Sequence, residues 1–140
     1  MDCINVIIRA NDSLTAFQYV KQFSEHCRSN VLTLNCEDLK KPGDLGTLSS
    51  LKANDVLFLY GLHKLGMDSE YVRYLHDAII DKRLNIEFIK GSFINIDLAP
   101  FNLVVHLNDG EELPSYMEGT DFKFEVNYIP DMPKKEKKTN

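Results

Sequence analysis

Val56-Leu57-Phe58-Leu59-Tyr60 is a run of five apolar residues that Gly61 ends. An apolar run of this length without alternation is typical of a β-strand that is buried on both faces, as in a parallel sheet. Similar runs occur at residues 4–9 and 31–35, and the intervening segments are long enough to hold helices. The sequence therefore predicts that residues 56–60 form one strand of a parallel sheet.

Helical patterns lie between the predicted strands. The run Asn11-Asp12-Ser13 can cap a helix, and apolar residues then recur at helical spacing to about Arg28. A short helix is predicted over residues 44–51, and a longer one follows a cap at Ser69. The order β-α-β-α-β-α favours an α/β fold with helices on both faces of a parallel sheet.

The pattern changes after this third helix. Two segments, 84–88 and 93–97, alternate apolar with polar residues on either side of Lys90-Gly91-Ser92. Such alternation around a glycine-containing turn predicts a β-hairpin from Leu84 to Asp97. Core strands at 102–106 and 122–128 would complete a five-stranded parallel sheet with flanking helices and an inserted hairpin.

Composition predicts one compact domain. The chain has 140 residues, 44% of them hydrophobic, which suits a domain over residues 1–130. Residues 131–140 contain the run Lys134-Lys135-Glu136-Lys137-Lys138, which we interpret as a disordered, solvated tail. The net charge of -5 disfavours phosphate contacts, so weak or no direct DNA binding is expected.

The cysteines and the apolar runs bear on cellular location. Cys3, Cys27 and Cys36 form no C-x-x-C pair, and their odd number favours free thiols in a reducing compartment. No apolar run approaches the roughly 18 to 20 residues that span a bilayer, and no signal peptide is apparent. A cytoplasmic location without membrane contact is therefore expected.

Several short motifs share the order and spacing of RuvB-like ATPases. Lys41-Pro42-Gly43-Asp44-Leu45 precedes Asn54-Asp55-Val56-Leu57-Phe58-Leu59 and His63-Lys64-Leu65, as K-P-G-D-L precedes G-D-V-L-F-I-D-E-I-H-R-L in that family. Farther on, Asp81-Lys82-Arg83-Leu84-Asn85-Ile86 is similar to D-F-R-L-D-I, and Lys90-Gly91-Ser92 to G-K-G. The run from Ile96 to Val104 is similar to I-D-L-P-P-F-T-L-V. Four matches in register make the resemblance specific from about Lys40 to Val104.

The resemblance implies the large domain of an AAA+ ATPase, a P-loop NTPase-like sheet with strand order 5-1-4-3-2. Active sites in such sheets lie at the carboxyl ends of the strands. A P-loop there needs G-x-x-x-x-G-K-T, whose backbone N–H groups and lysine hold the phosphates. This chain instead has RANDSLT from Arg9 to Thr15, without glycine or lysine. Asp12 brings a negative charge to the phosphate position, and Thr15 stands where the Mg²⁺ ligand would be.

The other catalytic motifs of the family also differ. Tyr60-Gly61 replaces the Asp-Glu of Walker B, which would hold metal and orient the attacking water, whereas His63 matches the family. Asn108 stands near the sensor position, and residues 115–122 lack the arginine-finger run. The family's helical lid and winged-helix domain have no counterpart among the residues that resemble it. We therefore expect no catalytic residue, no cofactor and no ATPase activity, with a vestigial cleft formed by Asn11, Asp12, Ser13, Thr15, Tyr60, Gly61, His63 and Asn108.

Two further polar groups have alternative interpretations. His63 and His106, with Cys36, fall near the carboxyl edge of the predicted sheet and suggest a metal site. Zinc prefers four ligands, and the sequence has no short-range ligand pair, so we favour polar residues that fill a vacated cleft and expect no metal. Asp109-Gly110-Glu111-Glu112 is interpreted as a solvated loop rather than a catalytic carboxylate pair.

The hairpin is the remaining candidate site. The resemblance implies that it corresponds to the presensor hairpin with which RuvB-like proteins bind their partner RuvA, and Phe88, Ile89 and Phe93 are the candidate contacts. The sequence favours a non-catalytic RuvB-like module that contacts a RuvA-like or RuvB-type protein, connected with DNA recombination or repair. The alternatives are an ATP-dependent Holliday junction helicase subunit with an unorthodox site, a small-molecule binder that uses the former cleft, and a hairpin without a binding role. The oligomeric state is left open.

Overall fold

A five-stranded parallel sheet forms the centre of the domain. The computed structural model describes residues 3–40, 42–64, 70–108, 110–113 and 125–128. The strand order is β2-β3-β6-β1-β7, which is the predicted order 5-1-4-3-2 read from the other edge. The strands are β1 (Asn5–Arg9), β2 (Val31–Asn35), β3 (Val56–Tyr60), β6 (Asn102–Leu107) and β7 (Glu125–Tyr128). The predicted α/β fold with a five-stranded parallel sheet is confirmed, although residues 122–124 of the predicted last strand lie outside the described residues.

Strand β3 is buried on both faces of the sheet, as its apolar run predicts. Val56 and Phe58 belong to the hydrophobic cluster on one face, and Leu57 and Leu59 belong to the cluster on the other. Leu57 also pairs in register with Leu103 of β6. Because alternate side chains of a strand point to opposite faces, only an uninterrupted apolar run can fill both clusters.

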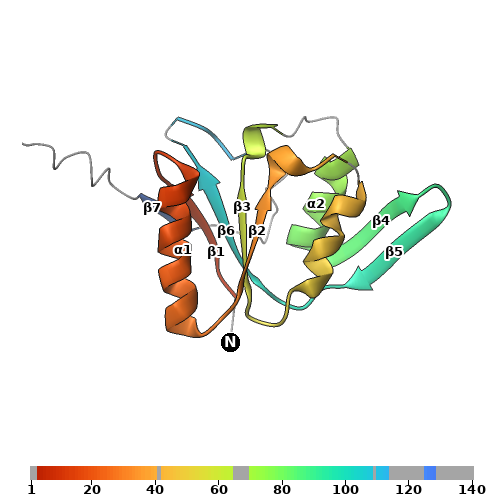
Figure 1. Cartoon of the computed structure of the whole chain (residues 1–140), viewed down its shortest axis with the longest axis horizontal. Helices are drawn as coiled ribbons and strands as arrows, with labels where there is room; N and C mark the ends of the chain where they lie inside the picture. Colours follow the sequence, from red (N-terminus) through yellow and green to blue (C-terminus); the bar gives the residue numbers. More distant parts are fainter. Residues whose placement is uncertain (1–2, 41, 65–69, 109, 114–124, 129–140) are drawn as a thin grey trace, which may run out of the picture.

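Helix α1 (Ser13–Cys27) covers one face of the sheet (Figure 1). Asp12 is its N-cap, with extended backbone angles and a carboxylate that accepts from the Thr15 amide. The helix ends at Arg28, whose φ of 58° is left-handed and whose amide bonds back to the last turn. Ala16 and Val20 are fully buried against the sheet.

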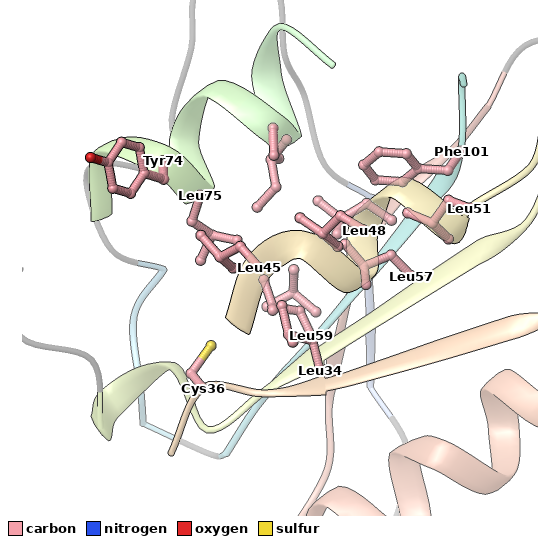
Figure 2. Packing of buried hydrophobic residues seen from close by; sticks show 14 of the residues in the cluster. Leu34, Cys36, Leu45, Leu48, Leu51, Leu57, Leu59, Tyr74, Leu75 and Phe101 are labelled. Carbon is pink, nitrogen blue, oxygen red and sulfur yellow. The ribbon is translucent and has the colours of Figure 1, made fainter. Parts of the chain in front are cut away.

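Helix α2 (Glu70–Ile80) and the 3₁₀ helix η2 (Pro42–Ser50) cover the opposite face (Figure 1). The short helix predicted over 44–51 is therefore a 3₁₀ helix. Leu45, Leu48 and Leu51 are buried, and Figure 2 shows them between α2 and the strands. Their spacing of three residues fits a helix with three residues per turn, which brings all three side chains to one line. The predicted cap of α2, Ser69, lies outside the described residues.

The hairpin forms a separate two-stranded antiparallel sheet of β4 (Arg83–Ile89) and β5 (Ser92–Asp97) that projects from the α2 side (Figure 1). Gly91, with φ of 85°, makes the turn. Leu84 and Ile86 are fully buried in the cluster beneath η2 and α2, so the hairpin also completes the core. This attachment explains how a two-stranded sheet, marginal in isolation, is held in place.

Candidate functional site

A cleft of about 430 Å³ opens at the carboxyl ends of β1, β2, β3 and β6. Each strand contributes side chains at its end or from the loop that follows it. Seven predicted residues line this cleft: Asn11, Asp12, Ser13, Tyr60, Gly61, His63 and Asn108. Asn35, Glu37, His106 and Glu111 also line it. The cleft thus occupies the position where nucleotides bind in related sheets.

Thr15 is the predicted cleft residue that the structure places elsewhere. It is absent from the residues that line the cleft, and its backbone amide donates to Asp12 Oδ1 at 2.8 Å. Thr15 belongs to the first turn of α1, where this capping bond holds it. Its distance from β1 along the chain is known from the sequence, whereas its place in the first turn of α1 is known only from the structure.

Asp12 places a carboxylate at the N-terminus of α1. The exposed amides and partial positive charge of a helix N-terminus are what bind phosphate in P-loop proteins. Here the Asp12 side chain satisfies one of these amides. A phosphate at this point would have to displace that bond and would be repelled by the carboxylate charge.

Gly61 stands where the resemblance places the second residue of the Walker B pair, and its backbone admits no larger residue without strain. Its φ is 73°, and a Cβ added to it would lie 2.6 Å from Asn35 Oδ1. Asn35 Oδ1 in turn accepts from the Glu37 amide at 3.1 Å, so it is held at this place. The preceding residue, Tyr60, stacks on Phe58 with 5.3 Å between ring centroids.

Glu111 was interpreted from the sequence as part of a solvated loop, and its side chain is 29% exposed and lines the cleft. Its carboxylate accepts from the Asn108 amide at 2.8 Å and lies 3.4 Å from His63 Nδ1. Arg9 fixes the same turn, since its guanidinium donates to the carbonyl oxygens of Asn108 and Glu111. Nothing in the local sequence distinguishes Glu111 from the exposed Glu112, and Asp109 lies outside the described residues.

The charge of Glu111 is favoured by these neighbours. Burial acts to raise the pKa of Glu111, but the hydrogen bonds from Asn108 and the nearby His63 and His106 outweigh it, and the pKa lies below its ordinary value. With Asp12 and Glu37, three carboxylates line the cleft, and among the described residues that line it there is no lysine or arginine. The electrostatic character of the cleft is opposite to that of a nucleotide site.

The histidines and Cys36 do not converge. His106 is 5% exposed and its Nε2 lies 3.1 Å from the Ala10 carbonyl oxygen, whereas His63 faces Glu111. Cys36 is buried outside the cleft lining, and burial raises the pKa of its thiol to about 12. Within the described part of the chain, no three His, Cys, Asp or Glu side chains are grouped to hold a metal ion.

The hairpin presents the second candidate surface. Ile89 and Phe93 are 63% and 64% exposed, so the exposure expected for these two residues is confirmed. Ile96 of β5, which sequence reasoning missed, is 39% exposed. The side chain of Phe88 lies outside the described part. Alternation does not predict this exposure of Ile96, because β4 packs against η2 and α2 whereas β5 is exposed along most of its length.

Comparison with known proteins supports the resemblance to RuvB. No family model matches the chain. It is 49% identical over 70 residues to the Holliday junction branch migration complex subunit RuvB of Parabacteroides distasonis, and 37% identical over 78 residues to that of Chlamydia abortus. These matches cover 47% and 53% of this chain but 20% and 23% of the relatives, so the chain spans about a fifth of their length.

Solved structures agree over almost the whole domain. Two RuvB mutants from Thermotoga maritima superpose with TM-scores of 0.70 and 0.69, each at 24% identity. They cover 91% and 90% of this chain and 38% of theirs. The strand order and the cleft at the carboxyl ends belong to an α/β fold that is similar to the fold of these P-loop AAA+ structures. In sequence, the chain is similar to RuvB over about half of its own length.

None of the helices in the described residues is both long and apolar enough to cross a membrane.

Proposed function

We propose that this RuvB-like domain is non-catalytic and acts through protein contacts of its β4–β5 hairpin, in connection with DNA recombination or repair. The observation that carries the proposal is the contrast between two sites. The cleft has an aspartate at the phosphate position and a glycine at the Walker B glutamate position, whereas the hairpin presents exposed apolar side chains.

Loss of catalysis is supported by geometry as well as by sequence. The Asp12 carboxylate occupies the helix terminus that would bind phosphate. At Gly61, the positive φ and the nearby Asn35 Oδ1 leave no space for the side chain that would activate water. Tyr60 cannot replace an aspartate as an Mg²⁺ ligand, because magnesium prefers carboxylate, carbonyl and water oxygens.

The protein is expected to show no change in melting temperature with a few millimolar MgATP. A ligand at 100 times its dissociation constant stabilises the native state by about 2.7 kcal/mol, which corresponds to roughly 3 to 6 °C in a domain of this size. Differential scanning fluorimetry, with phosphate release measured in parallel, checks this expectation. A reproducible shift of that size, or phosphate release above a buffer blank, would instead support an ATP-dependent motor subunit with an unorthodox site.

The hairpin is expected to be the contact surface for a RuvA-like or RuvB-type protein. Ile89 and Phe93 lie at the end of the ribbon away from the buried Leu84 and Ile86, and both are exposed. Large apolar side chains on a projecting, well-anchored element are typical of protein interfaces. The curated relatives are subunits of a branch migration complex, which agrees with a role in assembly.

Changing Phe93 to aspartate should weaken such an interaction at least tenfold, about 1.4 kcal/mol, because the variant would bury a charge in an apolar contact. Binding to RuvA from the same organism, measured by biolayer interferometry, is the direct test. The far-UV circular dichroism spectrum should remain unchanged, since Phe93 is 64% exposed. Tyr19→Asp is the matched control, because Tyr19 is an aromatic residue that is 44% exposed on α1, on the other side of the sheet from the hairpin. Equal binding by both variants would exclude the hairpin.

A second candidate function is binding of another ligand in the cleft. The cleft has a volume of about 430 Å³, which falls in the range of small-molecule sites. Polar side chains at the ends of four strands line it. This function does not exclude the first.

A further inference from the structure

An apolar groove adjoins the cleft. The groove has a volume of about 300 Å³ and is lined by Ser13, Leu14, Phe17, Thr33, Phe58 and Tyr60. It shares the lining residues Ser13 and Tyr60 with the cleft described above, so the two cavities lie next to each other. We refer to them as the aromatic groove and the acidic cleft.

The walls of the aromatic groove are formed by three rings. Phe17 of α1 lies 6.0 Å from Phe58 between centroids, and Phe58 stacks on Tyr60 at 5.3 Å. Leu14 lines the same groove and is 65% exposed. Aromatic and leucine side chains at an open groove provide apolar area that a partner's side chain could cover.

The acidic cleft supplies the complementary charge. Asp12, Glu37 and Glu111 line it, and no lysine or arginine is found among its lining residues in the described part of the chain. Arg9 is not among the lining residues, and its guanidinium donates to the carbonyl oxygens of Asn108 and Glu111. The amides at the N-terminus of α1 would favour an anion, but the Asp12 carboxylate already accepts from one of them.

We propose that the aromatic groove and the acidic cleft together bind a peptide segment of a protein partner in which a large apolar residue is next to a lysine or an arginine. The apolar side chain lies in the groove against Phe17, and the basic side chain enters the cleft towards Glu111. Ser13 and Tyr60, which belong to both cavities, fix the spacing between the two. The inference goes beyond the hairpin contact, but it rests on the proposal that the cleft does not hold nucleotide.

The test is a titration of the ¹⁵N-labelled full chain with the blocked dipeptide acetyl-Phe-Arg-amide, followed by amide shifts in two-dimensional NMR spectra. Saturable shifts are expected at Ser13, Tyr60 and Glu111, with a dissociation constant on the order of 1 mM for one apolar contact and one exposed ion pair. Shifts confined to the hairpin, or no saturation by about ten times that concentration, would overturn the inference.

Two matched peptides separate charge from apolar contact. Acetyl-Phe-citrulline-amide keeps the shape but lacks the charge, and acetyl-Gly-Arg-amide keeps the charge but lacks the ring. Each should bind roughly threefold more weakly, as expected for the loss of one exposed interaction. Equal affinity of the arginine and citrulline peptides would contradict the role of the acidic cleft.

Two variants assign the effect to the site. Glu111→Gln should lower the affinity for the arginine peptide roughly threefold. The glutamine side-chain oxygen can still accept a hydrogen bond from the Asn108 amide. Glu112→Gln removes the same charge from an exposed neighbour outside both cavities and should leave binding unchanged. If the two variants bind equally, the basic side chain does not enter the cleft.

MgATP serves as a separate arm of the same titration. Shifts at Ser13 and Tyr60 with MgATP would contradict the proposed non-catalytic function. If neither MgATP nor the arginine peptide shifts any amide signal, the peptide inference is overturned, but the proposed non-catalytic function is not.

Discussion

Changing Phe101 to alanine is expected to lower the free energy of unfolding by about 3 to 5 kcal/mol. Phe101 is fully buried immediately before β6, within the cluster that η2, α2 and β4 form on one face of the sheet (Figure 2). The Lys82 ammonium also lies 4.4 Å from the centre of its ring. Removal of the ring therefore leaves a cavity and removes this cation–π contact of Lys82. Urea denaturation followed by circular dichroism measures the loss.

Phe93→Ala is the control for this measurement, because it deletes the same ring from an exposed position. Phe93 is 64% exposed on β5, and its change to alanine should alter the unfolding free energy by about 0.5 kcal/mol or less. Comparable losses for the two variants would mean that the hairpin surface belongs to the core. Such a result would also remove the basis for a partner contact there.

Changing Gly61 to alanine is expected to destabilise the protein by roughly 2 to 4 kcal/mol. The left-handed conformation alone costs a residue with a Cβ about 1 to 2 kcal/mol. The new Cβ would also lie 2.6 Å from Asn35 Oδ1, and displacement of this oxygen breaks the capping bond to the Glu37 amide, which contributes about 1 kcal/mol more. The change is again measured by urea denaturation.

Two other glycines separate strain from steric contact. Gly91 has a φ of 85° and no atom within 4 Å of an added Cβ, so Gly91→Ala should cost the backbone strain alone. Gly46 has neither a positive φ nor such a neighbour, and Gly46→Ala should be nearly neutral. A Gly61→Ala loss no larger than that of Gly46→Ala would show that the position tolerates a side chain. The argument against a Walker B glutamate at this position would then fail.

The sheet and the hairpin could be predicted from the sequence because their signals are local. Val56–Tyr60 lacks polar residues since both faces of β3 are buried, and the hairpin was recognisable from two alternating segments on either side of a turn that contains Gly91. Asp12 could be predicted as part of a helix cap because aspartate is a common N-cap residue and apolar residues at helical spacing follow it. The motif order shared with RuvB-like ATPases added the strand order, which periodicity does not specify.

The composition of the cleft depended on the tertiary structure. Its residues come from four strand ends that are distant in the sequence, and only the parallel pairing of those strands brings Glu111 beside His63. The positive φ of Gly61 and its closeness to Asn35 likewise follow from the pairing of β3 with β2. Ile96 is exposed because β4, and not β5, packs beneath η2. Local patterns thus determined the elements, whereas long-range pairing decided which polar side chains face one another and where apolar surface remains.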